Sequence, residues 1–159
     1  MAEPPPEEKL SEAIRDEARR LDFDIVRIAP AVSPPGFHPL LKWIDNGYAA
    51  DMDWIERRQD AYQHPDGVMP GTRSVIVVAL NYANETPDAQ ATYRISRYAW
   101  GTSDYHTIIR KRLKQLARFI RDQRPTAWCR PVVDTAPLLE RDFARLAGVG
   151  WYGKNTMLI

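Results

Sequence analysis

Residues 74–82 read Ser74-Val75-Ile76-Val77-Val78-Ala79-Leu80-Asn81-Tyr82 and follow a turn at Pro70-Gly71. β-Branched residues dominate this run, and they do not alternate with polar ones. Such a run is typical of a strand that is covered on both faces. We therefore expect residues 74–82 to form the central strand of a sheet, with shorter strands at residues 24–29 and 127–133.

Helical patterns lie on both sides of this strand. Leu10, Ile14 and Leu21 space one apolar face along a mostly charged segment, which predicts an amphipathic helix. A longer helix is predicted to begin at Asp104 and to run to about Gln123, with one apolar and one basic face. Helices interleaved with strands predict an α/β fold, an α+β sandwich in which helices flank a mixed sheet.

Shorter helices complete the pattern. Residues 40–44 and 52–55 predict two short helices that are broken at a glycine. Near the end of the chain, Pro137 is predicted to open a helix that ends near Gly148, with Thr135 as its cap.

The composition indicates one soluble domain. The chain has 159 residues, and its 22 Lys and Arg against 21 Asp and Glu leave a net charge of +1. We expect the acidic, Pro-rich residues 1–8 to be disordered and residues 9–159 to form one domain. Since no apolar run resembles a secretion signal or could span a bilayer, we expect a cytoplasmic protein without a membrane partner.

The metal chemistry of the chain is restricted, because Cys129 is its only cysteine. One cysteine excludes an internal disulfide, a Cys-rich zinc site and an iron–sulfur cluster built from this chain alone. His38, His64 and His106 show no metal-ligand spacing. We therefore predict no metal site held by these histidines.

Asp134 lies where the predicted strand at residues 127–133 ends. An acid in this place is most often a turn or helix-capping residue. It can also act as a proton donor, because a bulky apolar cofactor that covers it would raise its pKa and keep it protonated near neutral pH. Ligands collect at the strand ends of α/β sheets, so both interpretations stay open.

The segment Gly148-Val149-Gly150-Trp151-Tyr152-Gly153 matches the spacing G-x-G-x-x-G, and Lys154 brings it close to a phosphate-binding loop. Both nucleotide motifs require a strand before the glycines and a helix after them, and a phosphate-binding loop has Ser or Thr where Asn155 stands. We expect the glycines instead to end the preceding helix and to let the backbone approach a flat group. The aromatic residues that either belong to the core or form the walls of a planar-ligand pocket are Tyr98, Trp100, Trp151 and Tyr152.

Two features mark the helix predicted from Asp104. Tyr105 and His106 form either a simple helix entry or a neutral proton relay, because the helix dipole disfavours a charged imidazole there. The basic face of this helix is either solvated or contacts RNA phosphates. Its residues are Arg110, Lys114, Arg118 and Arg121, joined by Lys111, Arg112 and Arg124.

Three blocks of sequence carry a family resemblance. They are Ile95-Ser96-Arg97-Tyr98-Ala99-Trp100-Gly101 with Asp104-Tyr105-His106, then Val133-Asp134-Thr135-Ala136-Pro137-Leu138-Leu139-Glu140-Arg141, then Ala147-Gly148-Val149-Gly150-Trp151-Tyr152-Gly153-Lys154-Asn155-Thr156. In this order, and together with residues 69–75, the blocks closely resemble the epoxyqueuosine reductase family.

The resemblance implies an enzyme that reduces the epoxide of epoxyqueuosine at the wobble position of certain transfer RNAs, the last step of queuosine synthesis. It implies that this chain is the cobalamin-binding domain of such an enzyme, with a fold akin to the cobalamin domains of reductive dehalogenases. Asp134 would then donate a proton to the epoxide oxygen, with Tyr105 and His106 beside it. The residues implied to touch the corrin ring or its amide arms are Ser96, Arg97, Asp134, Arg141, Gly153, Lys154, Asn155 and Leu158.

The chain also departs from the family. Its members continue with eight cysteines that hold two 4Fe–4S clusters, whereas this chain stops at Ile159. We therefore expect a fragment, a truncated product or one half of a split enzyme, which needs a separate iron–sulfur chain or another electron donor. Tyr62 stands where many relatives carry Arg. The main alternative is a non-catalytic module that binds RNA through the Arg110 to Arg124 face, and a weaker one is a flavin-type reductase domain.

Overall fold

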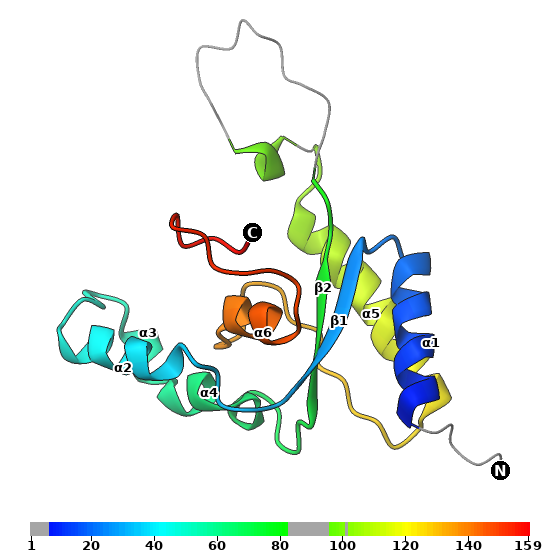
Figure 1. Cartoon of the computed structure of the whole chain (residues 1–159), viewed down its shortest axis with the longest axis horizontal. Coiled ribbons are helices and arrows are strands. Elements are labelled where there is room, and N and C mark those ends of the chain that lie inside the picture. Colours follow the sequence, from blue (N-terminus) through cyan, green and yellow to red (C-terminus); the bar gives the residue numbers. More distant parts are fainter. Residues whose placement is uncertain (1–6, 83–95, 101) are drawn as a thin grey trace, which may run out of the picture. The chain divides into compact units, whose positions relative to one another are not determined.

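The computed structural model describes residues 7–82, 96–100 and 102–159 (Figure 1). These residues fall into two compact units. The first unit comprises the described residues of Met1–Asp24 and Ala79–Val133, and the second comprises those of Ile25–Val78 and Asp134–Ile159. None of the helices in this described part has the length and apolar character that crossing a membrane would require.

The first unit is built on two helices, α1 (Glu7–Arg20) and α5 (Tyr105–Gln123), which pack against each other. Each helix turns one apolar side inward, as its sequence spacing predicts. The buried side chains are Ile14 and Ala18 of α1 and Leu116, Ala117 and Ile120 of α5. Both predicted amphipathic helices are therefore confirmed.

The start of α1 corrects one predicted boundary. Glu7 and Glu8 are helical, so the predicted disordered start at residues 1–8 is too long by two residues. Residues 1–6 lie outside the described residues.

Two hydrogen bonds fix the ends of this helix pair. The Asp104 carboxylate accepts a hydrogen bond from the backbone N–H of His106 (3.0 Å) and so caps the N-terminus of α5, which begins one residue after the predicted start. Farther along α5, the Arg112 guanidinium donates to the carbonyl of Asp22 (2.8 Å). Asp22 lies in the turn after α1 and has a left-handed backbone with φ of 59°.

The second unit contains a two-stranded sheet of β1 (Ile25–Pro30) and β2 (Ser74–Ala79). The strands run antiparallel, since the N–H of Asp24 bonds to the carbonyl of Ala79 and the N–H of Ala31 bonds to the carbonyl of Arg73. β2 is confirmed as a strand. Because it has one neighbouring strand among the described residues, it is an edge strand rather than a sheet centre, and its side chains are half-buried or exposed.

Helices cover the sheet and extend the second unit. α6 (Glu140–Leu146) packs on β1, and the side chains of Phe143, Val26 and Ala29 are almost fully buried. The shorter elements are α2 (Phe37–Asp45), α3 (Asp53–Glu56), α4 (Gln59–Gln63) and the 3-10 helix η1 (Pro65–Gly67). The two short helices predicted around the glycine break are α2 and α3, and Gly47 between them has φ of 72°.

Two predictions near the end of the chain are wrong, one of a strand and one of the start of a helix. Residues 127–133 form no strand, because Pro131 has no N–H to donate to a ladder. α6 begins at Glu140 rather than at Pro137, and its N-cap residue Leu139 makes no side-chain capping bond. Residues 134–139 form a loop instead, in which Asp134 has φ of 55°.

Phe143→Ala should destabilise the protein by about 3–5 kcal/mol, because the ring is buried and its removal leaves a cavity against β1. Urea denaturation measures this difference. Trp128→Ala is the control, since its side chain is 85% exposed, and we expect it to change stability by less than about 0.5 kcal/mol. Similar losses for the two variants would contradict the assignment of the core.

Candidate functional site

The predicted site residues form two groups, one in each unit, and each group is described by itself. The second unit holds Asp134, Arg141, Gly153, Lys154, Asn155 and Leu158. The first unit holds Ser96, Arg97, Tyr105, His106, Arg110, Lys114, Arg118 and Arg121.

The last residues of the second unit fold into a compact turn. Trp151 and Ile159 exchange two backbone hydrogen bonds (3.0 and 2.9 Å), and Tyr152 pairs with Leu158 in an antiparallel bridge. Gly153 lies against the side chains of Ile159 and Asn155, so a larger residue there would have to displace them. Lys154 and Asn155 are exposed at its tip. We call residues 151–159 the C-terminal turn.

The glycines before this turn behave as predicted. Gly148 follows α6 with φ of 73°, and its N–H bonds to the carbonyl of Arg145 (3.0 Å), which ends the helix. Among the described residues, a helix precedes the glycines and no helix follows them. The arrangement therefore lacks the strand and helix that a nucleotide-binding motif requires.

Arg141 in the first turn of α6 holds the tip of the C-terminal turn. Its guanidinium donates a hydrogen bond to the backbone carbonyl of Thr156. Thr156 has φ of 66°, a left-handed conformation that is unusual for a β-branched residue. The contact with Arg141 therefore restrains a strained backbone.

Asp142 is the buried charged residue of the described chain, with a side chain that is only 4% exposed. The Tyr152 hydroxyl donates to its Oδ1 (2.5 Å), and the backbone N–H of Gly36 donates to its Oδ2 (2.8 Å). A Cβ on Gly36 would lie 2.2 Å from that Oδ2, so the approach requires glycine. Asp142 therefore joins α6 to the C-terminal turn and to the loop before α2.

The same contact changes the acidity of Tyr152. Desolvation of the phenol, followed by its hydrogen bond to Asp142 and the negative charge of that carboxylate, raises the pKa of Tyr152 to about 12. The hydroxyl therefore remains a hydrogen-bond donor at neutral pH. The sequence indicated Tyr152 only as an aromatic wall and gave no role to Asp142.

Asp134 is exposed directly after the buried Val133, and Glu140 is its electrostatic neighbour. Desolvation by the surrounding protein raises the pKa of Glu140, and the charge of Asp134 raises it further. A hydrogen bond from the backbone N–H of Asp134 opposes this rise, although the Glu140 side chain still reaches the surface. Two interacting carboxyl groups with different acidities suit a site that handles protons.

Glu140 was missed as a site residue at the sequence level. It belongs to the block that carries the family resemblance, but six residues separate it from Asp134. The loop over residues 134–139 brings the two together. The sequence predicted a helix from Pro137 in place of part of this loop, and so did not indicate the contact.

In the first unit, His106 and its neighbours form a rigid helix entry. The Nδ1 of His106 lies 2.8 Å from the Oδ1 of Asp104, and this hydrogen bond is the main reason why the pKa of Asp104 is lowered. The ring of Tyr105 stacks on that of His106, with centroids 4.1 Å apart. These contacts fix the orientation of both side chains.

A row of tyrosines continues from this entry. Tyr98 meets Tyr105 edge to face at 5.9 Å, and Tyr82 meets Tyr98 edge to face at 6.5 Å. Tyr82 and Tyr98 are more than half exposed. Tyr82 was not predicted as a site residue, because its contact with Tyr98 spans a long stretch of sequence. We call Tyr82, Tyr98 and Tyr105 the tyrosine row.

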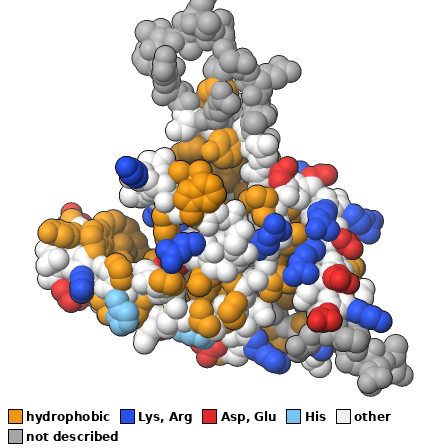
Figure 2. Space-filling model, viewed as in Figure 1, with side chains coloured by type: hydrophobic (Ala, Val, Ile, Leu, Met, Phe, Trp, Pro, Cys, Tyr) orange, Lys and Arg blue, Asp and Glu red, His pale blue; other side chains and the backbone are white. Residues whose placement is uncertain are grey.

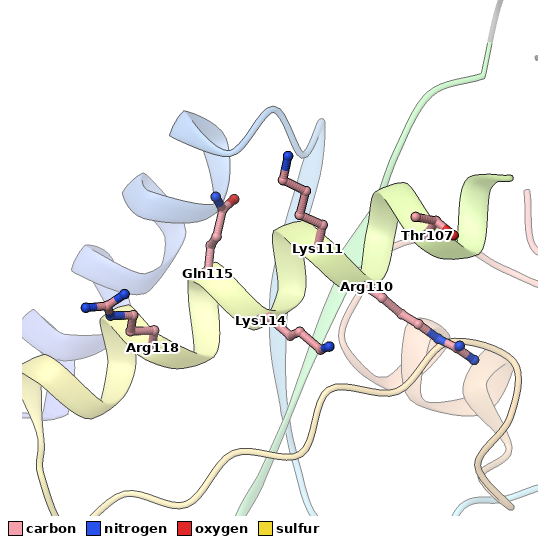
Figure 3. A pocket seen from close by; sticks show the side chains of 6 residues that line it. All are labelled: Thr107, Arg110, Lys111, Lys114, Gln115 and Arg118. Atoms are coloured by element: carbon pink, nitrogen blue, oxygen red, sulfur yellow. The ribbon is translucent and has the colours of Figure 1, made fainter. Parts of the chain in front are cut away.

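The basic residues of α5 line a surface hollow (Figure 3). Its side chains are Thr107, Arg110, Lys111, Lys114, Gln115 and Arg118. Figure 3 shows Arg110 and Lys114 projecting to one side of the helix and Lys111 and Gln115 to another. Figure 2 shows Lys and Arg side chains in blue among exposed apolar side chains in orange. We call Arg110, Lys111, Lys114 and Arg118 the α5 basic face.

Tyr152→Phe should destabilise the protein by about 1–3 kcal/mol, because it leaves the buried Asp142 carboxylate without one of its two donors. Urea denaturation measures the loss of stability. Tyr48→Phe, at a tyrosine that is 63% exposed, is the neutral control. In an alkaline absorbance titration, wild type should show a phenol ionising near pH 12 that the Tyr152→Phe variant lacks. A difference between the two curves that is centred at about pH 10, where an ordinary phenol ionises, would refute this contact.

Known proteins that are similar to this chain are epoxyqueuosine reductases. The family model described as epoxyqueuosine reductase QueG, DUF1730, matches residues 63–135. The epoxyqueuosine reductase of Synechococcus sp. (strain CC9605) is 36% identical over 157 residues, which cover 95% of this chain and 47% of that protein. The epoxyqueuosine reductase of Gloeobacter violaceus is 44% identical over 151 residues, which cover 92% of this chain and 46% of that protein.

A comparison of folds also finds epoxyqueuosine reductase. A crystal structure of epoxyqueuosine reductase with a tRNA-Tyr epoxyqueuosine-modified tRNA stem loop matches with a TM-score of 0.79 and 25% identity, over 95% of this chain and 41% of that one. The chain thus spans about half the length of the curated relatives it matches. The resemblance seen in the sequence is confirmed, and this chain is similar in both sequence and fold to epoxyqueuosine reductases.

Proposed function

We propose that this chain is the cobalamin-binding part of an epoxyqueuosine reductase and that Asp134 supplies a proton to the epoxide oxygen of the substrate. The observation that carries this proposal is the similarity to epoxyqueuosine reductases over 95% of the chain. The substrate would be epoxyqueuosine within a transfer RNA, because a solved relative was crystallised with such a stem loop.

The side chains of the second unit fit a corrinoid. Cobalamin presents a large planar ring rimmed with carboxamides, which need hydrogen-bonding groups on an accessible backbone. The C-terminal turn offers such groups, since Lys154 and Asn155 are exposed and Gly153 has no side chain to hold the ring away. In the second unit, the residues that would hold the cofactor are Gly153, Lys154, Asn155, Leu158 and Arg141. Ser96 and Arg97 belong to the first unit, and their proposed cofactor contacts rest on the sequence resemblance alone.

When bound, cobalamin supplies electrons to the epoxide. Removal of the epoxide oxygen as water breaks its bonds to carbon and consumes two electrons and two protons. Since Cys129 is the only cysteine, an iron–sulfur centre that delivers these electrons would have to lie on another region or another chain.

Asp134 is suited to hold one of the two protons. Its carboxyl is exposed in a loop whose left-handed backbone is anchored at Glu140, so a ligand can reach it without rearrangement of the core. A cofactor that covers Asp134 would remove it from water and favour its protonated form. Tyr105 and His106, in the first unit, are the other residues proposed to take part in catalysis.

A titration of the purified chain with cob(II)alamin tests the cofactor assignment. We expect saturable binding with a changed absorption and paramagnetic resonance spectrum, and Asp134→Asn, whose side chain has the same size and is still polar, should also bind. With a chemical reductant and epoxyqueuosine-containing RNA, Asp134→Asn should lower deoxygenation by about 10²–10⁴-fold, the range for loss of a general acid. Asp51→Asn, at an exposed carboxylate in the same unit, is the matched control. A folded wild-type protein that binds no corrinoid would refute the assignment.

Glu140→Gln tests the raised pKa of Glu140 through the pH dependence of the free energy of unfolding. The raised pKa means that the folded state favours protonated Glu140, so this stabilisation is present at low pH and is lost as pH rises through the raised value. Glutamine stays neutral and still accepts from the Asp134 N–H. We expect wild type and variant to match near about pH 4 and the variant to be the more stable near about pH 8 in urea denaturation. Parallel pH profiles would show that folding does not raise the pKa of Glu140.

A further inference from the structure

We propose that the α5 basic face and the tyrosine row together form an RNA-binding surface of the first unit, which takes a stem-loop whose unpaired bases are accessible. The inference rests on the proposed function for the identity of the RNA as a transfer RNA. The surface itself is argued from the side chains of α5 and of the segments that contact it.

The positive charges of α5 repel one another and so lower the stability of the helix. Arg110, Lys114 and Arg118 follow one another at four-residue intervals, which places like charges on neighbouring turns and destabilises an isolated helix. No acidic residue occurs from Tyr105 to Arg121. Bound anions would relieve this repulsion, and phosphate groups are the anions that nucleic acids present in a row.

The cations of this face are available to such a partner. Arg110, Lys111, Lys114 and Arg118 are exposed, and none of them forms an ion pair with a carboxylate within the described residues. The other two residues of the hollow, Thr107 and Gln115, add neutral hydrogen-bonding groups (Figure 3). The hollow therefore has no carboxylate to repel a phosphate.

The tyrosine row offers a different contact at the beginning of the same helix. Tyr82 and Tyr98 are 58% and 55% exposed, and edge-to-face packing links them to Tyr105. Exposed aromatic rings stack with unpaired bases, and a groove that pairs such rings with cations is typical of proteins that bind single-stranded nucleic acid. From Tyr105 to Arg118, α5 advances about 20 Å, enough for contacts with several nucleotides.

A membrane surface fits these observations less well than RNA does. An amphipathic helix that lies on a bilayer must insert its apolar side. Three apolar side chains of α5, Leu116, Ala117 and Ile120, are buried, and α5 packs against α1, so these side chains are not available to insert. The face that remains is basic, which suits phosphates in water.

Fluorescence anisotropy with a labelled RNA stem-loop tests the surface, and a fully paired duplex of the same stem serves as the second probe. The double variant Arg110→Gln, Lys114→Gln removes two cations and relieves their repulsion, so it should fold. We expect it to weaken binding of both RNAs at least tenfold and to reduce the slope of log affinity against log salt by about 1.4–1.8. Arg57→Gln, Arg58→Gln is the matched control on exposed arginines of the second unit, and it should bind as wild type does.

Tyr98→Ala separates base stacking from phosphate contact. We expect it to weaken binding of the stem-loop about tenfold and to leave duplex binding unchanged, because paired bases offer no free face. The proposal is overturned if wild type binds neither RNA, if the double variant matches its arginine control, or if only vesicles of phosphatidylserine are bound. Cobalamin binding by a protein that fails these RNA tests would remove this inference alone, whereas RNA binding without cobalamin binding would remove the proposed function and leave this surface.

Discussion

Asp142 carries a buried negative charge, and the second unit is arranged around the two donors that satisfy it. A carboxylate with 4% exposure is costly unless each oxygen is bonded. One donor, the Gly36 N–H, comes from 106 residues earlier, and the other, the Tyr152 hydroxyl, from ten residues later. The loop before α2, the first turn of α6 and the C-terminal turn therefore depend on one another, since loss of either donor leaves a buried charge underpaired.

The residues beside Asp142 extend this arrangement to the proposed site. Glu140 interacts with Asp134, Arg141 bonds to the carbonyl of Thr156, and Asp142 bonds to Tyr152. Successive residues point about 100° apart around a helix of 3.6 residues per turn, so three consecutive side chains can reach three different segments. The first turn of α6 thereby holds the loop of Asp134, the proposed proton donor, and the proposed cofactor turn in one framework. Asp134 and Thr156, which both have positive φ, lie in the two segments that it holds.

The parts of the fold that local sequence determines were predictable. α5 was predicted because its apolar spacing is a local pattern that repeats within a few residues. The strand predicted at residues 127–133 failed because its apolar pattern ignored the missing N–H of Pro131. The role of Asp142 could not be predicted, since an acid near a helix start usually faces water and its Gly36 partner is remote in sequence. The exposed Asp134 was found through its sequence block, whereas the contact with Glu140 needed the loop geometry.

The distribution of charge between the two units has a physical rationale if the substrate is a macromolecule. A net charge of +1 would attract no polyanion, yet α5 concentrates cations within a few turns. Salt screens interactions beyond roughly 10 Å, so a phosphate responds to the nearest cations and not to the average charge of the chain. Binding energy gained far from the reacting bond can be used to orient that bond. An enzyme that acts on one nucleoside of an RNA therefore gains by placing phosphate and base contacts on one helix pair and its proton donor on a separate framework.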